Sequence, residues 1–185
     1  MIAATAESPG AAQASDRLTI ELIRRRLASE SVGRHIYLFG RVASTGEVLR
    51  RLADAGAREG TVVVSDDEPG LRVSALCRLA DPLHALPALA FGVARALGEA
   101  LRTAGSPTAV GAECATAAHG GAWAILGVAV NFGGAPGGPP RHFDRNAFVA
   151  GFLDALARLL AAYTAGGPAA VLAPAGAGRR TDAGE

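Results

Sequence analysis

Lysine is absent from this chain of 185 residues, and all eighteen of its basic residues are arginine. Seventeen acidic residues nearly balance them, which leaves a formal net charge of +1. Without an excess of positive charge there is no electrostatic argument for binding nucleic acid or an anionic membrane surface. The missing lysine also excludes every mechanism that needs a lysine ammonium group.

Cysteine and targeting segments are scarce as well. Cys77 and Cys114 are too few for a disulfide framework, so we expect two buried, reduced thiols. The first fifteen residues have neither the basic n-region nor the apolar h-region of a signal peptide, and no uncharged apolar run approaches the about 18 residues of a membrane span. We therefore expect a cytoplasmic protein that does not bind membranes. The histidines lack metal-ligand spacing, so no metal site is predicted from them: His35, His84, His119 and His142.

The composition predicts one folded domain between two tails. Half of the residues are hydrophobic, and the chain is long enough for a single substantial core. Residues 1–15 are small and polar, and residues 166–185 are rich in Gly, Ala and Pro. We expect both segments to be disordered, which places the domain at residues 16–165.

Hydrophobic periodicity predicts an α+β fold. Helical spacing predicts four helices, at Thr19–Ser29, Thr45–Ala57, Leu83–Thr103 and Asp144–Tyr163. Alternation and β-branched content predict strands at Arg34–Val42, Thr61–Val64, Leu71–Leu79 and Ala122–Phe132, the last of them in a hairpin around "HGG". This order of elements is typical of a mixed, largely antiparallel sheet with packed helices.

Ser44 and Thr45 stand where the second helix begins. Ser44 and Glu47 satisfy the S-x-x-E pattern of a capping box, in which each side chain bonds the backbone amide of the other residue. A hydroxyl pair at a helix N-terminus also suits a polar ligand, because free amides and the positive end of the helix dipole point the same way. The pattern alone leaves both interpretations open.

Residues Gly33–Val64, "GRHIYLFGRVASTGEVLRRLADAGAREGTVVV", resemble the start of the catalytic domain of biotin–protein ligases, in the biotin/lipoate protein ligase superfamily. That family has a strand that ends in Asp-Ser-Thr-Asn, then a helix, then Gly-Ala-x-Glu-Gly-Thr-Val-Val. Ser44 and Thr45 match the Ser-Thr pair, and Gly56–Val63 match the second motif. Later segments, "VSALCRL", "AILGVAVNF" and "FDRNAFVAGFLDALARLLAAY", follow in the family's order, so the likeness covers about Thr19 to Tyr163.

The resemblance implies a biotin/lipoate protein ligase-like fold for residues 16–165 and a ligand site made by Ser44, Thr45, Gly127 and Asn131. The residues themselves leave plainer roles open for the last two. Asn131 is typical of a turn that ends a strand, and Gly127 of close strand packing. No catalytic residue and no metal ligand is assigned.

The chain departs from the family at the positions that handle ATP. The family's Arg/Gly-rich loop is replaced by "SDDEPG" (Ser65–Gly70), whose three acidic residues are expected to repel ATP. Its Lys-Trp-Pro-Asn-Asp segment and Gly-x-Lys-x-x-Gly hairpin have no counterpart in Thr103–Thr116. Ala43 and Gly46 replace the Asp and Asn around the Ser-Thr pair. Arg72 or Arg78 could supply a cation instead, although the strand pattern favours an ordinary surface or sheet-edge role for both.

These departures predict a divergent ligase-like domain, a pseudoenzyme that does not adenylate biotin and keeps a partial small-acid pocket or a partner-binding role. The alternative is an active biotin–, lipoyl– or octanoyl–carrier-protein ligase or transferase with a rebuilt site, and a purely structural subunit is a third reading. Biotin and ATP are implied as ligand and cofactor only if the family activity is retained. The implied partners are a small carboxylic acid of the biotin or lipoate class, and a biotinyl/lipoyl carrier protein or another ligase-like subunit.

Overall fold

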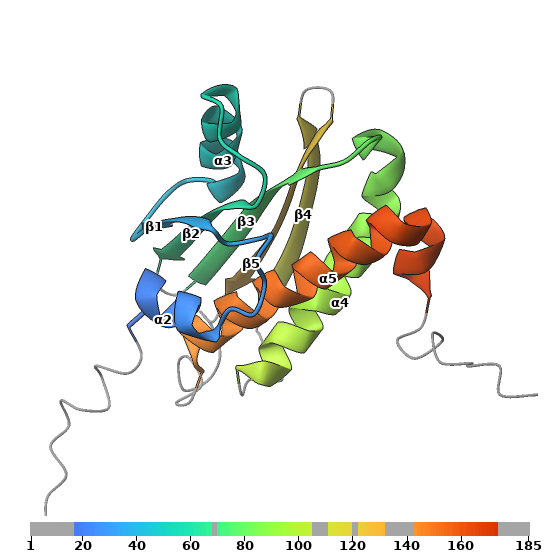
Figure 1. Cartoon of the computed structure of the whole chain (residues 1–185). Coiled ribbons are helices and arrows are strands. Elements are labelled where there is room, and N and C mark those ends of the chain that lie inside the picture. Colours follow the sequence, from blue (N-terminus) through green and yellow to red (C-terminus); the bar gives the residue numbers. More distant parts are fainter. Residues whose placement is uncertain (1–16, 68–69, 105–110, 120–121, 132–142, 174–185) are drawn as a thin grey trace, which may run out of the picture.

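Four helices and five strands make up the part of the chain that the structure, a computed structural model, describes (Figure 1). That part comprises residues 17–67, 70–104, 111–119, 122–131 and 143–173, with the backbone alone for 111–119. The elements in order are α2 (Ile20–Arg26), β1 (His35–Phe39), α3 (Thr45–Asp54), β2 (Thr61–Asp67), β3 (Gly70–Arg78), α4 (Pro82–Thr103), β4 (Gly111–His119), β5 (Trp123–Asn131) and α5 (Arg145–Leu172).

The five strands form one mixed sheet in the order β1-β2-β3-β5-β4. β1 and β2 are parallel, and α3 forms the crossover that such a pair requires. The other three pairings are antiparallel, including the predicted β4–β5 hairpin. The expected mixed, largely antiparallel α+β architecture is thereby confirmed.

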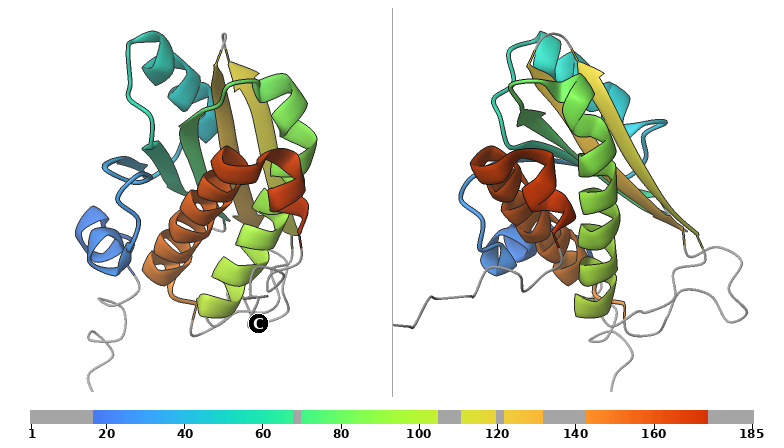
Figure 2. Two further views of the ribbon diagram at one scale, coloured as in Figure 1. Left: turned by 45° about the vertical axis from the view of Figure 1, so that its right-hand side comes forward. Right: turned by 90° about the vertical axis from the view of Figure 1, so that its right-hand side faces the viewer.

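The two faces of the sheet carry different helices. α4 and α5 lie side by side across one face, while α3 lies on the other (Figures 1 and 2). Because side chains alternate along a strand, Val62, Val64 and Val73 face the large core under α4 and α5. Val63 and Leu76 face a smaller core that Leu49 and Ile125 complete under α3.

β2 extends three residues farther than the sequence predicted. Ser65, Asp66 and Asp67 were expected in a turn, but they continue the strand to its pairing with β3. Ser, Asp and Gly favour turns because their side chains or backbones satisfy turn geometry locally. Here cross-strand hydrogen bonds and arginine partners from distant segments outweigh that preference.

α5 also runs beyond its predicted end, and the tail boundary drawn at residue 165 falls inside a helix. Gly167 kinks the helix with φ +63°, and the next turn continues to Leu172. Arg95 on α4 donates hydrogen bonds of 3.1 Å each to the carbonyls of Val171 and Ala173, and Val171 is buried. Contacts with α4 thus order a stretch whose Gly and Pro content predicted disorder. The remainder of both predicted tails lies outside the described residues.

By length and hydropathy, α5 could also cross a membrane, and no other helix in the described ranges could. A buried core helix meets the same criteria, and 44% of its apolar window is buried here. Phe148, Phe152 and Leu156 are fully buried in the core beside the sheet. The packing accounts for the apolar character of α5 without a bilayer.

Candidate functional site

The candidate site is the part of the sheet that α3 leaves uncovered at its N-terminal end. α3 begins at Thr45, beside Ser74, and runs over the small core that contains Leu76. On the same sheet face, beyond the start of α3, β2 and β3 present Ser65 and Arg72 as a cross-strand pair. The first amides of α3 therefore lie next to a polar stretch of sheet in which Ser65 and Ser74 are buried and Arg72 is partly exposed.

Ser44 and Thr45 have separate roles. The Ser44 hydroxyl accepts a hydrogen bond of 3.2 Å from the Glu47 amide and caps α3, as predicted. The Glu47 carboxylate pairs with Arg50 and Arg51, so within the described residues only the first half of the capping box forms. Thr45 is buried and turns to the sheet, where its Oγ1 lies 2.8 Å from Oγ of Ser74.

Gly127 lies directly opposite Ser74 in the β3–β5 register. A Cβ atom at this position would come within 2.5 Å of Ser74 Oγ and 2.7 Å of the Val73 carbonyl oxygen. Glycine is therefore required for the Ser74 side chain to lie where it can bond Thr45. The structure brings Thr45, Ser74 and Gly127 together, and it gives Gly127 the close-approach role that the sequence had left open.

Asn131 is at the far end of this face. It ends β5 opposite Gly70, and its side chain is exposed. It is four positions along β5 from Gly127, a span of about 13 Å. Asn131 shares the sheet face with the other predicted site residues but does not meet Thr45.

Ser65 is the residue that sequence reasoning missed. It is completely buried, and its Oγ is the single buried side-chain nitrogen or oxygen atom without a hydrogen-bond partner in the part of the chain that the structure describes. An unpartnered buried hydroxyl costs about 1–3 kcal/mol relative to a bonded one. The alternation of Thr61, Val63 and Ser65 was the available sign that this residue faces the same way as Val63.

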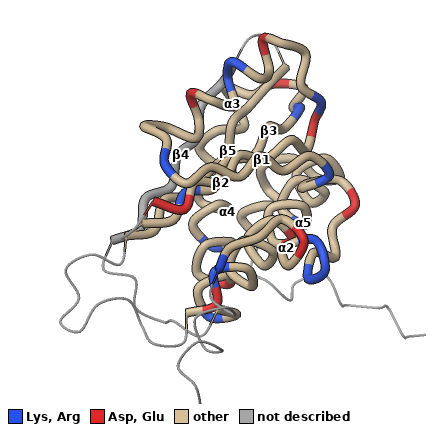
Figure 3. The backbone as a smooth tube through the Cα atoms, turned by 90° about the vertical axis from the view of Figure 1, so that its left-hand side faces the viewer, with Lys and Arg blue, Asp and Glu red and all other residues tan. Residues whose placement is uncertain are grey.

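Arg72 faces Ser65 across the β2–β3 pairing, and Asp67 lies between Arg72 and Arg41. Asp67 Oδ1 lies 2.9 Å from Nε of Arg41, and Asp67 Oδ2 lies 3.7 Å from Nη1 of Arg72. The same Arg72 nitrogen donates a hydrogen bond of 3.3 Å to the Val42 carbonyl, just before α3. Figure 3 shows acidic and basic segments of the backbone close together beside β2.

The charge balance differs from what the sequence predicted for "SDDEPG". Asp66 pairs with Arg145, and Asp67 with Arg41 and Arg72, so the two aspartates are neutralised rather than presented to a ligand. Glu68 lies outside the described residues. Of the two arginines considered as substitute cations, Arg72 borders the site, whereas Arg78 lies over the ring of Trp123 at the other end of the strand.

No metal or thiol centre accompanies this site in the described part of the chain. No three His, Cys, Asp or Glu side chains there lie close enough to hold a metal ion. His84 is exposed and bonds Asp81, the N-cap residue of α4. Cys77 is buried in the large core, and burial raises the pKa of its thiol far above the usual range, so it is a packing residue.

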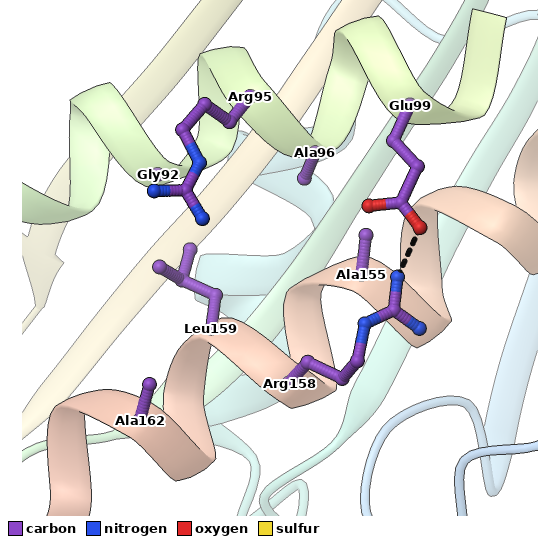
Figure 4. Close-up of a pocket in the computed structure, with 8 residues that line it drawn as sticks. All are labelled: Gly92, Arg95, Ala96, Glu99, Ala155, Arg158, Leu159 and Ala162. Carbon is purple, nitrogen blue, oxygen red and sulfur yellow. Dashed lines mark hydrogen bonds and ion pairs between the residues drawn. The ribbon is translucent and has the colours of Figure 1, made fainter. Parts of the chain in front are cut away.

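A hollow of about 300 Å³ lies between α4 and α5, on the opposite side of the sheet (Figure 4). Small side chains line it, and its charged groups are occupied. Arg158 pairs with Glu99, and Arg95 bonds the end of α5. This hollow is a helix–helix groove in which each charged side chain has a partner, and the one buried unbonded side-chain atom of the described residues, Ser65 Oγ, lies elsewhere.

Comparison with known proteins supports the fold. No protein-family model and no curated protein matches the sequence. Among solved structures, biotin protein ligase from Aquifex aeolicus matches with a TM-score of 0.58 at 16% identity, over 74% of this chain and 72% of that one. The same enzyme in complex with biotin and ATP gives 0.53 at 15% identity, over 73% and 74%.

A third similar structure is the biotin acetyl coenzyme A carboxylase synthetase of Helicobacter pylori with bound biotinylated ATP. It matches with a TM-score of 0.50 at 15% identity, over 66% of this chain and 73% of that one. At such identities the likeness concerns the fold alone. The described part of the chain has the α+β fold of a biotin protein ligase catalytic domain.

Proposed function

We propose that this chain is a divergent biotin/lipoate protein ligase-like domain that binds a small carboxylic acid beside the N-terminus of α3 and does not adenylate it. The observation that carries the proposal is the buried, unpartnered hydroxyl of Ser65 on the sheet face next to that N-terminus. Buried polar groups in native proteins are nearly always bonded, and an exception needs an explanation. A bound polar ligand supplies the missing partner.

The surroundings of Ser65 suit an acid of this kind. The first amides of a helix and its positive dipole end favour a negatively charged or hydrogen-bond-accepting group. Thr45 and Ser74 add hydroxyl oxygens, and Gly127 and Ala129 keep the neighbouring strand free of large side chains. The solved structures of similar fold that contain biotin and ATP, or biotinylated ATP, support the same class of ligand.

The absence of adenylation follows from charge. Adenylation builds negative charge on phosphorus while pyrophosphate leaves, and preorganised cations must stabilise it. The chain has no lysine and no Arg/Gly-rich loop. Beside the described site, Arg41 is paired with Asp67, which leaves Arg72 as a single guanidinium for the charge that would develop on phosphorus.

Binding is tested by calorimetry of biotin, lipoate and octanoate with the wild type and the Ser65→Ala variant. We expect at least one acid to bind the wild type and to bind the variant more weakly. The variant itself should be as stable as the wild type or more stable, because the substitution removes an unbonded buried hydroxyl. Binding of none of the three acids to the wild type contradicts the proposal.

Ser29→Ala is the matched control. The Ser29 hydroxyl accepts hydrogen bonds from the amides of Ser31 and Val32, in the loop that follows α2. This variant should lose stability and keep the wild-type affinity, the reverse of Ser65→Ala. Equal losses of affinity in both variants would show that the effect comes from general destabilisation.

The enzymatic alternative is tested separately. Pyrophosphate release from ATP is measured with biotin, lipoate and octanoate in turn, in the presence of a biotinyl or lipoyl carrier domain. We expect none. Detection of biotinyl-AMP, or of a modified carrier, would instead establish an active ligase with a rebuilt site.

A further inference from the structure

The side chain of Arg72 is partly exposed, and some of its N–H groups bond no other described residue. Its side chain is 39% exposed and extends from near the start of β3 toward the start of α3. A guanidinium has five N–H donors, but the contacts of Arg72 with described residues all use Nη1. Nε and Nη2 remain without a partner among those residues.

The position of this guanidinium is set from two sides. The Val42 carbonyl bonds Nη1 at 3.3 Å, and the Asp67 carboxylate lies 3.7 Å from the same atom. Asp67 makes its closer contact with Arg41, at 2.9 Å. Arg72 is therefore oriented by a backbone carbonyl while its own charge is only loosely compensated.

Ser65 lies directly across from Arg72 in the β2–β3 register. Paired residues on one face of a sheet have Cβ atoms about 4.5–5.5 Å apart. A carboxylate that bonds Nε and Nη2 of Arg72 would lie beside the Ser65 hydroxyl, which can donate to the same group. Two parallel N–H···O bonds are the usual geometry between arginine and a carboxylate.

We propose that Arg72 is the specificity residue of the site: it binds the carboxylate of the acid in its ionised form, with Ser65 as an additional donor and Asp67 as the competing anion. This assignment rests on the proposed function. The charged contact with Arg72 distinguishes an acid from the amide or ester of the same molecule. Hydroxyl groups and strand packing alone do not make this distinction.

The test compares each acid with its neutral amide by calorimetry at pH 7: octanoate with octanamide, lipoate with lipoamide and biotin with biotinamide. The wild type should prefer the acid. Arg72→Gln should weaken binding of the acid by about 10- to 100-fold, the effect of a hydrogen bond to a charged group, and should leave the amide nearly unchanged. Equal affinity of the wild type for acid and amide overturns the assignment.

Asp67→Asn supplies a test of the opposite sign. Removing the competing negative charge should tighten binding of the acid at least about threefold, with little effect on the amide. Unchanged or weaker binding of the acid would overturn the role given to Asp67. A merely structural role for these residues would change both ligands in the same direction.

Arg78→Gln is the matched control, since Arg78 lies on the same strand, six residues from Arg72, with its guanidinium over the ring of Trp123. It should keep the wild-type preference for the acid. Loss of the preference in Arg78→Gln as well would show that the preference follows the total positive charge of the strand and not the position of Arg72, and would overturn the assignment. If acid and amide bind equally, only the assignment of Arg72 fails, whereas absence of all binding refutes the proposed function itself.

Discussion

The hydrogen bond between Thr45 and Ser74 yields a prediction at the scale of single residues. Both side chains are buried, and their hydroxyl oxygens are 2.8 Å apart. Thr45→Val leaves the Ser74 hydroxyl buried without this partner, so the free energy of unfolding should fall by about 1–3 kcal/mol. The double variant Thr45→Val/Ser74→Ala removes both polar groups and should recover most of the loss. Urea denaturation of the three proteins measures these differences.

Ser44→Ala separates the helix cap from this buried pair. It removes the bond to the Glu47 amide and should lower the free energy of unfolding by about 1 kcal/mol, whichever residue occupies position 74. If the double variant Thr45→Val/Ser74→Ala is as unstable as Thr45→Val alone, the loss of stability comes from altered packing at Thr45 and not from the lost hydrogen bond.

The residues that could be predicted from sequence are those whose partners are close in the chain. Ser44 and Glu47 are one helical turn apart, and the predicted cap is confirmed. Thr45 and Ser74 are 29 positions apart, and their contact depends on how α3 lies on β3. Ser65 was expected in a turn because the residues after it are acidic. The arginines that pair with those acidic residues and allow the strand to continue come from distant segments.

Helix–helix packing yields a prediction at the scale of elements. A Cβ atom at Gly92 on α4 would lie 2.2 Å from Cδ1 and 2.8 Å from Cδ2 of Leu159 on α5. In Gly92→Ala either Leu159 changes rotamer or the helices separate, at about 1–3 kcal/mol. That outweighs the up to about 1 kcal/mol by which alanine favours a helix over glycine. Thermal unfolding should show a lower melting temperature.

Gly98→Ala is the control on the same helix, because nothing lies within 4 Å of a Cβ atom there. It should raise stability by up to about 1 kcal/mol through helix propensity alone. Opposite signs for the two substitutions are expected. A stabilising Gly92→Ala would show that the contact between α4 and α5 is looser than the structure indicates.

At this scale the sequence predicted where elements lie better than where they end. The centres of all predicted helices and strands are confirmed, because hydrophobic periodicity reflects the side of each element that is buried. The ends of β2 and α5 were wrong for a common reason. Partners that the local sequence does not contain hold them in place: Arg41 and Arg145 for β2, and Arg95 for the last turn of α5.

On the scale of the whole molecule, the first and last described elements are joined by hydrogen bonds. Asn146 at the start of α5 accepts from the Thr19 amide and donates to the Arg17 carbonyl, at 3.0 and 3.1 Å. Half-buried Asp154, farther along α5, accepts from the amides of Ala28 and Ser29. These bonds close the segment around α2 over α5.

Asp144 adds a charged contact between α2 and α5. Its carboxylate caps α5 through the Ala147 amide and pairs with Arg26 on α2. Partial burial acts to raise the pKa of Asp144, but the hydrogen bonds from Arg26 and Ala147 outweigh it and hold the pKa below its usual range. The ionised form therefore favours the folded state, a contribution that is complete above the unfolded-state pKa of about 3.9 and is lost as the pH falls through the lower folded-state value.

Asp144→Asn should consequently be less stable than the wild type at pH 7, and the gap should narrow as the pH falls below about 4. Asparagine keeps the ability to cap a helix, so the variant removes the charge with little effect on the cap. Unfolding free energies measured by urea between neutral pH and pH 2.5 give the gap directly. In an Arg26→Gln background the same substitution should have a smaller effect at neutral pH, since part of the interaction is already missing. A gap that stays constant through the acid range would show that Asp144 acts through hydrogen-bond geometry alone, and that its charge does not hold α2 against α5.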